Sequence, residues 1–454
     1  MDRILSPRRF ASASNALKFL SATSVRGRVA AVSGLTVEIV GLSAHVGVGD
    51  RVILQPGRGQ NVIAEIVGFR AGVCIAMAYG PAEGLGLGSE VQIKPPVLRS
   101  SLYIDDRWRG RVMDPLGNPL DGKGPLDRGA AARPVYVSPP EATRRARLGP
   151  RIDLGVAAIN LFATCRKGQR LGLFAGTGVG KSTLMGMLAR ETRCDVAVIA
   201  LVGERGREVR EFLEDDLGAA GMQQAVLVVA TADSSPLMRR EAAPAAMAIA
   251  EHFRDQGANV LFMMDSVTRY CMALREIGLA GGELPASRGY PPSVFTELPR
   301  LLERAGPGTD AAGREGYITG LFSVLVEGDD HSEPIADAMR GILDGHIILD
   351  RRVAEGGRYP AVDVLRTLSR AVPGCNSADE NALTRRARAI LALHEDTQDL
   401  LRLGAYRAGT DPAVDEAVRL VPQIENVLRQ ERDYSVSLPD AFQRLRSALM
   451  EAEA

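Results

Sequence analysis

Residues 169–184 read QRLGLFAGTGVGKSTL, a short apolar run followed by a glycine-rich turn and the start of a helix. The turn from Ala175 to Ser182 fits the pattern of a phosphate-binding loop, with Ala175 where the general pattern has its first glycine. Glycines let the backbone wrap round a phosphate, and the following helix adds the positive end of its dipole. A strand-like φ at Ala175 is needed to accommodate the methyl group. The stretch predicts a nucleoside triphosphate site.

Two side chains of this loop have predicted contacts. Lys181 is expected to reach the β- and γ-phosphates, and the hydroxyl of Ser182 to ligate Mg²⁺. The alternative, a glycine-rich turn without a ligand, is disfavoured by the strand–turn–helix context. The residues predicted to bind the nucleotide here are Gly176, Thr177, Gly178, Val179, Gly180, Lys181, Ser182 and Thr183.

The bulk composition is that of a globular protein with two or three domains, since 454 residues exceed one ordinary core. Apolar residues make up 46% and charged residues 24%, and the formal net charge of +0 argues against a surface built to attract nucleic acid. The 5 cysteines are scattered, which favours a reducing compartment and no zinc site. No apolar stretch reaches the roughly 18 residues of a membrane span, and no signal-peptide core is evident. A cytoplasmic protein is expected.

The pattern along the chain divides it into four parts. Residues 1–22 form a basic arm, read either as a frayed terminus or as an amphipathic arm for a partner or an anionic lipid surface. Residues 23–95 contain short β-type runs broken by glycine, which predict a small β-barrel. We expect a packing module rather than an oligonucleotide binder, because paired aromatics are few and a basic stripe is lacking. Residues 96–377 alternate apolar strands with helices, which predicts an α/β fold with a parallel sheet, and residues 378–454 are helical.

Two carboxylates follow apolar strands of the predicted sheet. NVLFMMD ends in Asp265, at a strand end where an acid can hold the water shell of Mg²⁺. DVAVIALVG leads directly into GERGREV, where Glu204 can orient and deprotonate an attacking water. In the same motif Arg205 is expected to contact the γ-phosphate and Glu208 to bind the water shell of the metal. A surface helix with alternating charges is the alternative for this motif.

Several longer strings resemble the flagellum-specific ATPases of type III protein export, a group related to the catalytic subunit of rotary ATP synthases. The resemblance extends from Arg26 to about Ala408 and is carried by GERGREV, DSVTRY, GYPPSVFTELPRLLERAG, VEGDDHSEPIADAMRGILDGHIILDRR and YPAVDVLRTLSR. It implies an N-terminal β-barrel, a central P-loop NTPase core of RecA-like type and a C-terminal helical domain, assembled as a six-membered ring. The segmentation of the chain has the same three parts.

The resemblance also implies roles for individual residues. Tyr359 matches an aromatic that stacks on adenine, and Arg370 matches an arginine finger that reaches into the site of the neighbouring subunit. Tyr406, in LGAYRAG, is a looser match to a second aromatic at the base. The implied catalytic residues are Lys181, Glu204, Arg205 and Arg370, and the implied metal-side residues are Ser182, Asp265 and Glu208.

The implied activity is hydrolysis of Mg-ATP by a homohexamer that energises flagellar protein export. Because one chain contains the base, the metal ligand and the finger, a ring of identical copies with a site at each interface is favoured. The alternatives are an injectisome export ATPase, a catalytic subunit of a rotary synthase, a hexameric RNA helicase and a protein that binds nucleotide for assembly alone. RNA stimulation of the ATPase would reveal the helicase.

The resemblance finally implies partners and a location. These are a regulatory stator-like protein at the N-terminal arm, a coiled-coil stalk and chaperone-bound cargo at the C-terminal domain, and the export gate. Peripheral association of a cytoplasmic protein with the inner membrane at the export apparatus is expected, with possible contact to anionic lipid and none to nucleic acid.

Overall fold

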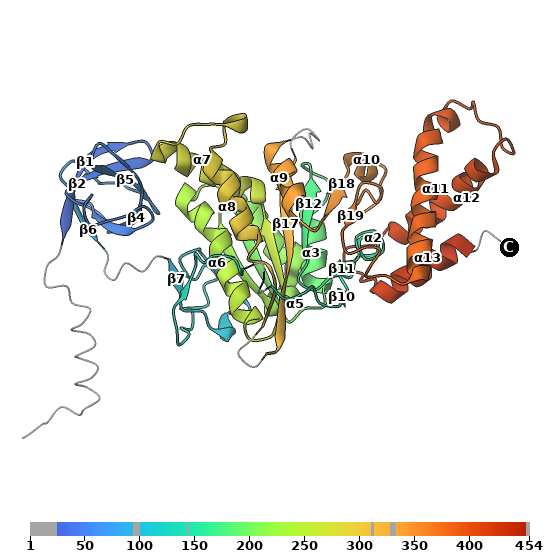
Figure 1. Cartoon of the computed structure of the whole chain (residues 1–454), viewed down its shortest axis with the longest axis horizontal. Coiled ribbons are helices and arrows are strands. Elements are labelled where there is room, and N and C mark those ends of the chain that lie inside the picture. The colour runs from blue at the N-terminus through green and yellow to red at the C-terminus, as the bar shows by residue number, and fades with distance from the viewer. Residues whose placement is uncertain are drawn as a thin grey trace, which may run out of the picture.

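A computed structural model describes residues 25–93, 100–141, 143, 145–309, 313–326 and 333–450. The predicted arm of residues 1–22 lies outside these residues. Figure 1 shows an elongated molecule with a small barrel at one end, a large mixed α/β body in the middle and a group of helices at the other end. Within the described part of the chain, no helix combines the length and apolar character that crossing a membrane requires.

The N-terminal unit is a closed antiparallel barrel of six short strands, in the order β1-β2-β5-β4-β3-β6. Alternate side chains point inward, so that Val29, Ile39 and Leu54 are buried while their neighbours face outward. The predicted barrel is therefore confirmed. Its strands are β1 (Arg26–Ser33), β2 (Thr36–Val40), β3 (Arg51–Gln55), β4 (Val62–Arg70), β5 (Val73–Ala78) and β6 (Glu90–Ile93).

The central body is built on a nine-stranded sheet whose core is parallel. The parallel order is β18-β12-β17-β15-β13-β14-β8, with β19 antiparallel at one edge and β16 antiparallel to β17. The predicted parallel α/β core is confirmed. The strands are β8 (Arg111–Met113), β12 (Arg170–Ala175), β13 (Val196–Val202), β14 (Ala225–Ala230), β15 (Asn259–Asp265), β16 (Gly306–Thr309), β17 (Glu315–Leu325), β18 (Gly345–Leu349) and β19 (Leu368–Ser369).

Both faces of this sheet are covered, which explains why its strands are continuously apolar. In β13, Ala197 and Ile199 join the core on one face, whereas Val196 and Val198 join the core on the other. The first face carries α2 (Ala157–Phe162), α3 (Lys181–Glu191), α4 (Gly206–Glu211), the π-helix η3 (Phe212–Leu217) and α5 (Gly218–Gln224). The second carries α6 (Pro236–Arg254), α7 (Val267–Gly281), α8 (Pro292–Leu302) and α9 (Pro334–Ile342).

The C-terminal helices pack against the first face through α2. Ser377 and Glu380 form a reciprocal capping box that starts the first of these helices. The three are α11 (Ala378–Arg402), α12 (Pro412–Leu428) and α13 (Leu438–Met450). The remaining short elements are η1 (Asp106–Trp108), η4 (Ser287–Gly289), α10 (Arg351–Glu355) and the pairs β7 (Ser101–Leu102) with β9 (Arg133–Pro134) and β10 (Arg151–Ile152) with β11 (Cys165–Arg166).

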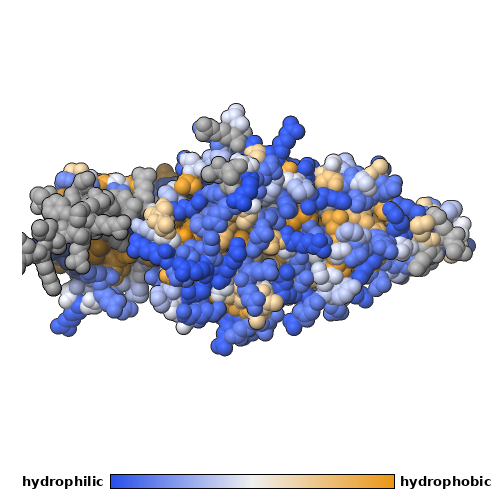
Figure 2. All heavy atoms as spheres, turned by 90° about the horizontal axis from the view of Figure 1, so that it is seen from below, coloured by the Kyte–Doolittle hydropathy of each residue, from blue (hydrophilic) through white to orange (hydrophobic). Residues whose placement is uncertain are grey.

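The surface seen in Figure 2 is mostly hydrophilic over the central body, with small hydrophobic areas between the polar side chains. The apolar residues of the central strands lie inside, in the two layers on either side of the sheet. A ligand site is therefore expected at the carboxyl ends of the strands, where polar groups gather.

Candidate functional site

The glycine-rich loop connects the end of β12 to the start of α3. Ala175 is the last residue of the strand and is buried, so its extended backbone accommodates the methyl group as the sequence required. Gly178 and Gly180 have φ values of 76° and 87°, in the left-handed region that favours glycine. Gly180 is the N-cap of α3, and Lys181 and Ser182 stand in its first turn. The loop therefore presents the N-terminus of a helix to a phosphate.

Lys181 lies between the two predicted carboxylates. Its Nζ is 2.5 Å from Oδ1 of Asp265 and 3.6 Å from Oε1 of Glu204. The hydroxyl of Ser323 on β17 donates to the same Oδ1 of Asp265 at 2.6 Å. Because β12, β17, β15 and β13 are parallel neighbours, their carboxyl ends bring these side chains together from distant parts of the chain.

The electrostatics of this group suit a base that works near neutrality. Burial raises the pKa of Glu204 to about 7, with Lys181 opposing the rise and Asp265 adding to it. Burial alone would lower the pKa of Lys181, but Asp265 and Glu204 raise it above its ordinary value. The hydrogen bond that Glu204 makes to Glu208 is the main cause of the lowered pKa of Glu208. A glutamate with a pKa near 7 is well placed to accept a proton.

Glu204 owes its position to the turn that follows β13. Gly203 has a φ of 74°, and a Cβ at that residue would lie 2.9 Å from Cβ of Arg269. The carbonyl of Glu204 accepts a hydrogen bond from the backbone N–H of Ala232 at 2.9 Å. Its Oε1 is buried, has no hydrogen-bond partner among the described residues, and faces Nζ of Lys181 at 3.6 Å.

Two arginines of the site were missed by the sequence reasoning. Arg269 opposes the raised pKa of Glu204, and it stands in the first turn of α7, four residues after Asp265 in the string DSVTRY. Arg351 on α10 donates from Nη2 to the carbonyl of Thr177 at 3.3 Å. The spacing of Arg269 was a signal in the sequence, whereas the reach of Arg351 depends on how β18 packs beside β12.

Arg205 lies outside the buried group. Its guanidinium pairs with Glu208 at 3.4 Å, and both side chains are exposed at the start of α4. Among the charged residues of GERGREV, only Glu204 lies within ion-pair distance of Lys181. The predicted contacts of Arg205 with a phosphate and of Glu208 with a metal shell stay predictions.

Tyr359, which the resemblance implies as an adenine-stacking aromatic, stands beside the phosphate loop. A Cβ on Gly180 would lie 3.4 Å from Cε1 and 3.5 Å from Cδ1 of its ring. The ring is 47% exposed, so one part contacts the loop and the rest is open to a ligand. This position is suited to stacking on a base, which stays a prediction.

Arg370 is not brought to the phosphate loop of its own chain. It follows β19, whose Ser369 pairs with Gly345 at the start of β18. The other end of β18, at Leu349, pairs with Ala175 beside the loop, and the two ends are roughly 13 Å apart along the strand. Arg370 is exposed at this far end of the sheet edge.

Tyr406 contacts the start of α12 rather than the phosphate loop, and its predicted place at the base stays a prediction. Its hydroxyl donates to the carbonyl of Asp411 and the carboxylate of Asp415, each at 2.9 Å, at the start of α12. The carbonyl of Tyr359 accepts from the N–H of Gln430, in the linker just beyond the other end of this helix. The 17 residues of α12 span about 25 Å along the helix axis, between the Tyr406 contacts at its start and Gln430 beyond its end.

The donor set fits a metal that arrives with its nucleotide. Ser182 is exposed in the first turn of α3, Asp265 places a carboxylate beside Lys181, and Oε1 of Glu204, which has no hydrogen-bond partner among the described residues, faces the same lysine. Among the described residues no cluster of three metal-binding side chains is present. Mg²⁺ typically takes one or two protein oxygens and completes its shell with waters and substrate phosphates.

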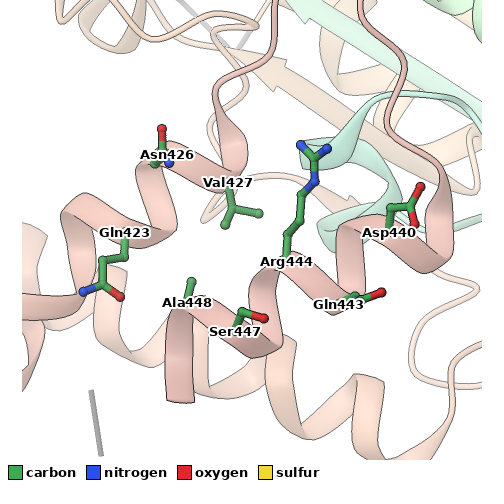
Figure 3. Close-up of a pocket in the computed structure, with 8 residues that line it drawn as sticks. All are labelled: Gln423, Asn426, Val427, Asp440, Gln443, Arg444, Ser447 and Ala448. Atoms are coloured by element: carbon green, nitrogen blue, oxygen red, sulfur yellow. The ribbon is translucent and has the colours of Figure 1, made fainter. Parts of the chain in front are cut away.

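A separate hollow of about 600 Å³ lies between α12 and α13. Figure 3 shows the side chains that line it, with Gln423 and Val427 on α12 and Arg444 on α13. The phosphate loop, the two carboxylates and Tyr359 do not line it, so it is distinct from the candidate site.

The fold and the site together define a P-loop ATPase core, with a lysine, a strand-end aspartate and a glutamate whose pKa lies near 7. Residues 155–369 match the nucleotide-binding domain of the ATP synthase alpha/beta family, and residues 376–447 match the T3SS EscN ATPase C-terminal domain.

Similar proteins then specify the branch of this class. The flagellum-specific ATP synthase of Caulobacter vibrioides is 50% identical over 435 residues, which cover 94% of this chain and 96% of the relative. That of Pseudomonas aeruginosa is 43% identical and covers 100% of both chains. The assembled ATPase EscN of the enteropathogenic E. coli type III secretion system has a TM-score of 0.86 at 35% identity, covering 93% of this chain and 100% of EscN. The chain belongs to the family of flagellum-specific ATP synthases and type III secretion ATPases, and it is an ATP-hydrolysing enzyme.

Proposed function

We propose that this protein hydrolyses Mg-ATP to energise flagellar type III protein export, as a cytoplasmic ring of six identical copies. The relatives from Caulobacter vibrioides and Pseudomonas aeruginosa that support the flagellar system carry the name flagellum-specific ATP synthase. The ring is supported by the likeness to EscN, which was solved as an assembled ATPase and in complex with its central stalk EscO. The four predicted parts of the chain, 1–22, 23–95, 96–377 and 378–454, are proposed as its domains.

The proposal of a site shared between two copies depends on one observation. Lys181, Asp265 and Glu204 meet within one chain, whereas Arg370 is exposed at the far end of β18. An arginine placed at the edge of the molecule can reach the nucleotide of an adjacent copy. Each reaction centre then combines the loop of one copy with the finger of the next.

The roles within the site follow from chemistry and position. Lys181 binds the phosphates through its ammonium group, and Glu204 orients a water for in-line attack and takes its proton. Arg370 of the neighbouring copy offsets the charge that develops on the transferred phosphoryl group. Ser182 and Asp265 would hold Mg²⁺, which when bound neutralises phosphate charge.

The partners at the two ends of the chain are part of the same proposal. By analogy with EscN and its stalk EscO, a coiled-coil stalk would contact the helices α11, α12 and α13, as would chaperone-bound cargo. The basic arm of residues 1–22 would bind a regulatory stator-like protein, with occasional contact to anionic lipid at the inner membrane near the export gate.

Mixing two inactive variants tests the shared site. Lys181→Ala removes the phosphate contact and Arg370→Ala removes the finger, so each ring made of one variant should lose nearly all turnover. Rings mixed from both contain some interfaces with an intact lysine on one side and an intact arginine on the other, and these should regain ATPase activity. The control is Arg300→Ala, which removes an exposed arginine of α8 that pairs with Glu297. Mixed rings that form but hydrolyse no ATP would refute the shared site.

An injectisome ATPase is the second candidate, because the type 3 secretion system ATPase of Xanthomonas euvesicatoria is 42% identical over 94% of both chains. Expression of the chain in a flagellated bacterium that lacks its own flagellar export ATPase distinguishes the two. Restored motility supports the flagellar system. No motility there, together with restored needle secretion in a strain that lacks its injectisome ATPase, supports the injectisome.

A further inference from the structure

Gln430 is a buried amide in the linker between α12 and α13. It is 5% exposed, and its side chain makes hydrogen bonds to three different backbone groups. Its Oε1 accepts from the N–H of Ala157 at 2.9 Å, and its Nε2 donates to the carbonyls of Gly155 at 2.8 Å and Tyr434 at 2.6 Å. The amide oxygen accepts one hydrogen bond and the NH₂ group donates two, so both polar atoms of the side chain are satisfied.

The bond to Ala157 satisfies the start of a helix. Ala157 begins α2, and the N-cap residue Val156 makes no side-chain capping bond. The first N–H groups of a helix lack partners within the helix, so Gln430 serves as a cap supplied from a distant part of the chain. A carboxylate at this position would face two carbonyl oxygens without a proton to donate.

The same residue is attached to Tyr359 through its backbone. The N–H of Gln430 donates to the carbonyl of Tyr359 at 2.9 Å, and the Tyr359 ring lies against Gly180 of the phosphate loop. The linker thus bonds to Tyr359, and the ring of Tyr359 in turn contacts the phosphate loop. A shift of residue 430 would therefore move the ring relative to the loop.

The linker is held at the other end of α3 as well. Arg190, in the last turn of that helix, donates from Nη2 to the carbonyl of Arg432 at 2.5 Å and lies 3.7 Å from the carboxylate of Asp433. Residues 430–433 therefore contact both ends of the phosphate-loop helix, at its N-cap through Tyr359 and at its last turn through Arg190. The linker is fixed to the nucleotide domain at three points: α2, Tyr359 and α3.

We propose that Gln430 is a positioning residue for the nucleotide base, which holds Tyr359 against the phosphate loop from the C-terminal helical unit. The inference rests on the proposed stacking of Tyr359 on the base. Gln430 itself is separated from the phosphates by Tyr359, so its side chain affects the base half of the ligand and leaves the phosphate half unchanged.

The test compares two ligands on the full chain by isothermal titration calorimetry with Mg²⁺. One is a non-hydrolysable ATP analogue, which has a base, and the other is inorganic tripolyphosphate, which has none. Gln430→Met keeps the approximate shape of the side chain and removes its three hydrogen bonds. We expect its affinity for the ATP analogue to fall about tenfold and its affinity for tripolyphosphate to stay within twofold.

Two controls make the comparison specific. Gln423→Met is the matched variant on α12, since Oε1 of Gln423 has no hydrogen-bond partner among the described residues, and both affinities should be unchanged. Gln430→Asn retains the amide on a shorter side chain and serves where Gln430→Met does not fold, with a smaller loss for the ATP analogue. Tyr359→Ala tests the proposed stacking of Tyr359 on the base. It should lower the affinity for the ATP analogue and leave the affinity for tripolyphosphate unchanged.

The outcomes separate the inference from the proposed function. Equal losses for both ligands in Gln430→Met, or no loss for either, overturn the positioning role. If Tyr359→Ala lowers the affinity for the ATP analogue and Gln430→Met does not, the proposed stacking of Tyr359 stands. Only the positioning role of Gln430 then fails. If Tyr359→Ala has no effect, the base contact and the inference fail together, while the roles of Lys181 and Glu204 are unaffected.

Discussion

Arg240 on α6 and Glu65 in the barrel strand β4 form a two-pronged ion pair, with Nη1–Oε1 and Nη2–Oε2 distances of 2.8 and 2.6 Å. Both side chains are largely buried between the barrel and the central body. Tyr79 of the barrel donates to Glu65 at 2.6 Å, and Arg51 of the barrel pairs with the fully buried Glu241 of α6 at 2.9 Å. This network of matched charges fixes the barrel on the central body.

Breaking this pair should destabilise the protein, and the losses from removing either partner should not be additive. Glu65→Gln leaves the buried guanidinium of Arg240 without its main partner, and we expect a loss of about 3 kcal/mol in the free energy of unfolding. The double variant Glu65→Gln, Arg240→Met should lose less than the sum of the two single variants. Urea unfolding followed by circular dichroism measures these losses. The control is Glu83→Gln, an exposed acid of the same barrel, and a loss equal to that of Glu65→Gln would contradict the argument.

The contribution of Glu65 should also depend on pH. Burial would raise the pKa of Glu65, but Arg240 and the hydrogen bonds from Arg240 and Tyr79 lower it below the ordinary value of 4.5. A depressed carboxyl pKa contributes stability above 4.5 that is lost as the pH falls through the lower, folded-state value. The stability difference between the parent chain and Glu65→Gln should therefore be full at pH 7 and shrink below pH 4.5. Unfolding curves of both proteins between pH 7 and pH 3 test this, and a difference that stays constant would rule it out.

Glu204→Gln should separate nucleotide binding from hydrolysis. The amide keeps the size of the side chain but cannot accept the proton of the attacking water, so turnover should fall by about 10²–10⁴ while the nucleotide still binds. Steady-state ATPase rates and nucleotide titrations measure the two effects. Glu211→Gln is the matched control, because Glu211 is an exposed glutamate of the next turn, paired with Arg207 at 2.7 Å. Normal turnover in Glu204→Gln, together with loss in Glu208→Gln, would transfer the role of base to Glu208.

Gly186→Ala should disturb the packing of the phosphate-loop helix. A Cβ on Gly186 of α3 would lie 2.7 Å from Cβ and 2.8 Å from the carbonyl oxygen of Asp216 in the π-helix η3. The backbone carbonyl of Asp216 cannot move away from the added methyl group as a flexible side chain could. We therefore expect a loss of about 1–3 kcal/mol in the free energy of unfolding. Gly341→Ala in α9 is the control, since nothing lies within 4 Å of its added Cβ and alanine favours a helix. Thermal unfolding compares the two, and equal melting temperatures would refute the clash.

The elements of the sheet that were predictable are those buried on both faces. NVLFMMD corresponds to β15 at Asn259–Asp265, and DVAVIALVG corresponds to β13 at Val196–Val202. The edge strands were not predicted, because β8 has only three residues and β19 only two. A long apolar run is local information, whereas a short edge strand forms only because a neighbouring strand offers it hydrogen bonds.

The site shows the same division between local and tertiary information. Lys181 and Ser182 follow from one continuous loop, and Asp265 and Glu204 follow from their places directly after apolar strands. Arg351 gave no local signal, because it reaches Thr177 from a helix that only the pairing of β18 with β12 brings near. The role of Tyr406 stays a prediction, because a sequence match to an aromatic contains no information on which end of α12 the residue occupies.

The sequence by itself determined the phosphate loop, the strand-end carboxylates, the barrel and the helical end, because each is encoded in contiguous residues with a fixed period or turn chemistry. Only the tertiary structure decided that Glu204 lies 3.6 Å from Lys181 with its pKa raised to about 7, that Gln430 caps α2 and bonds to Tyr359, and that Arg370 stands apart from its own loop. These relationships depend on the order of parallel strands and on contacts between residues far apart in the chain. Burial and the distance between charges arise only when the layers are packed.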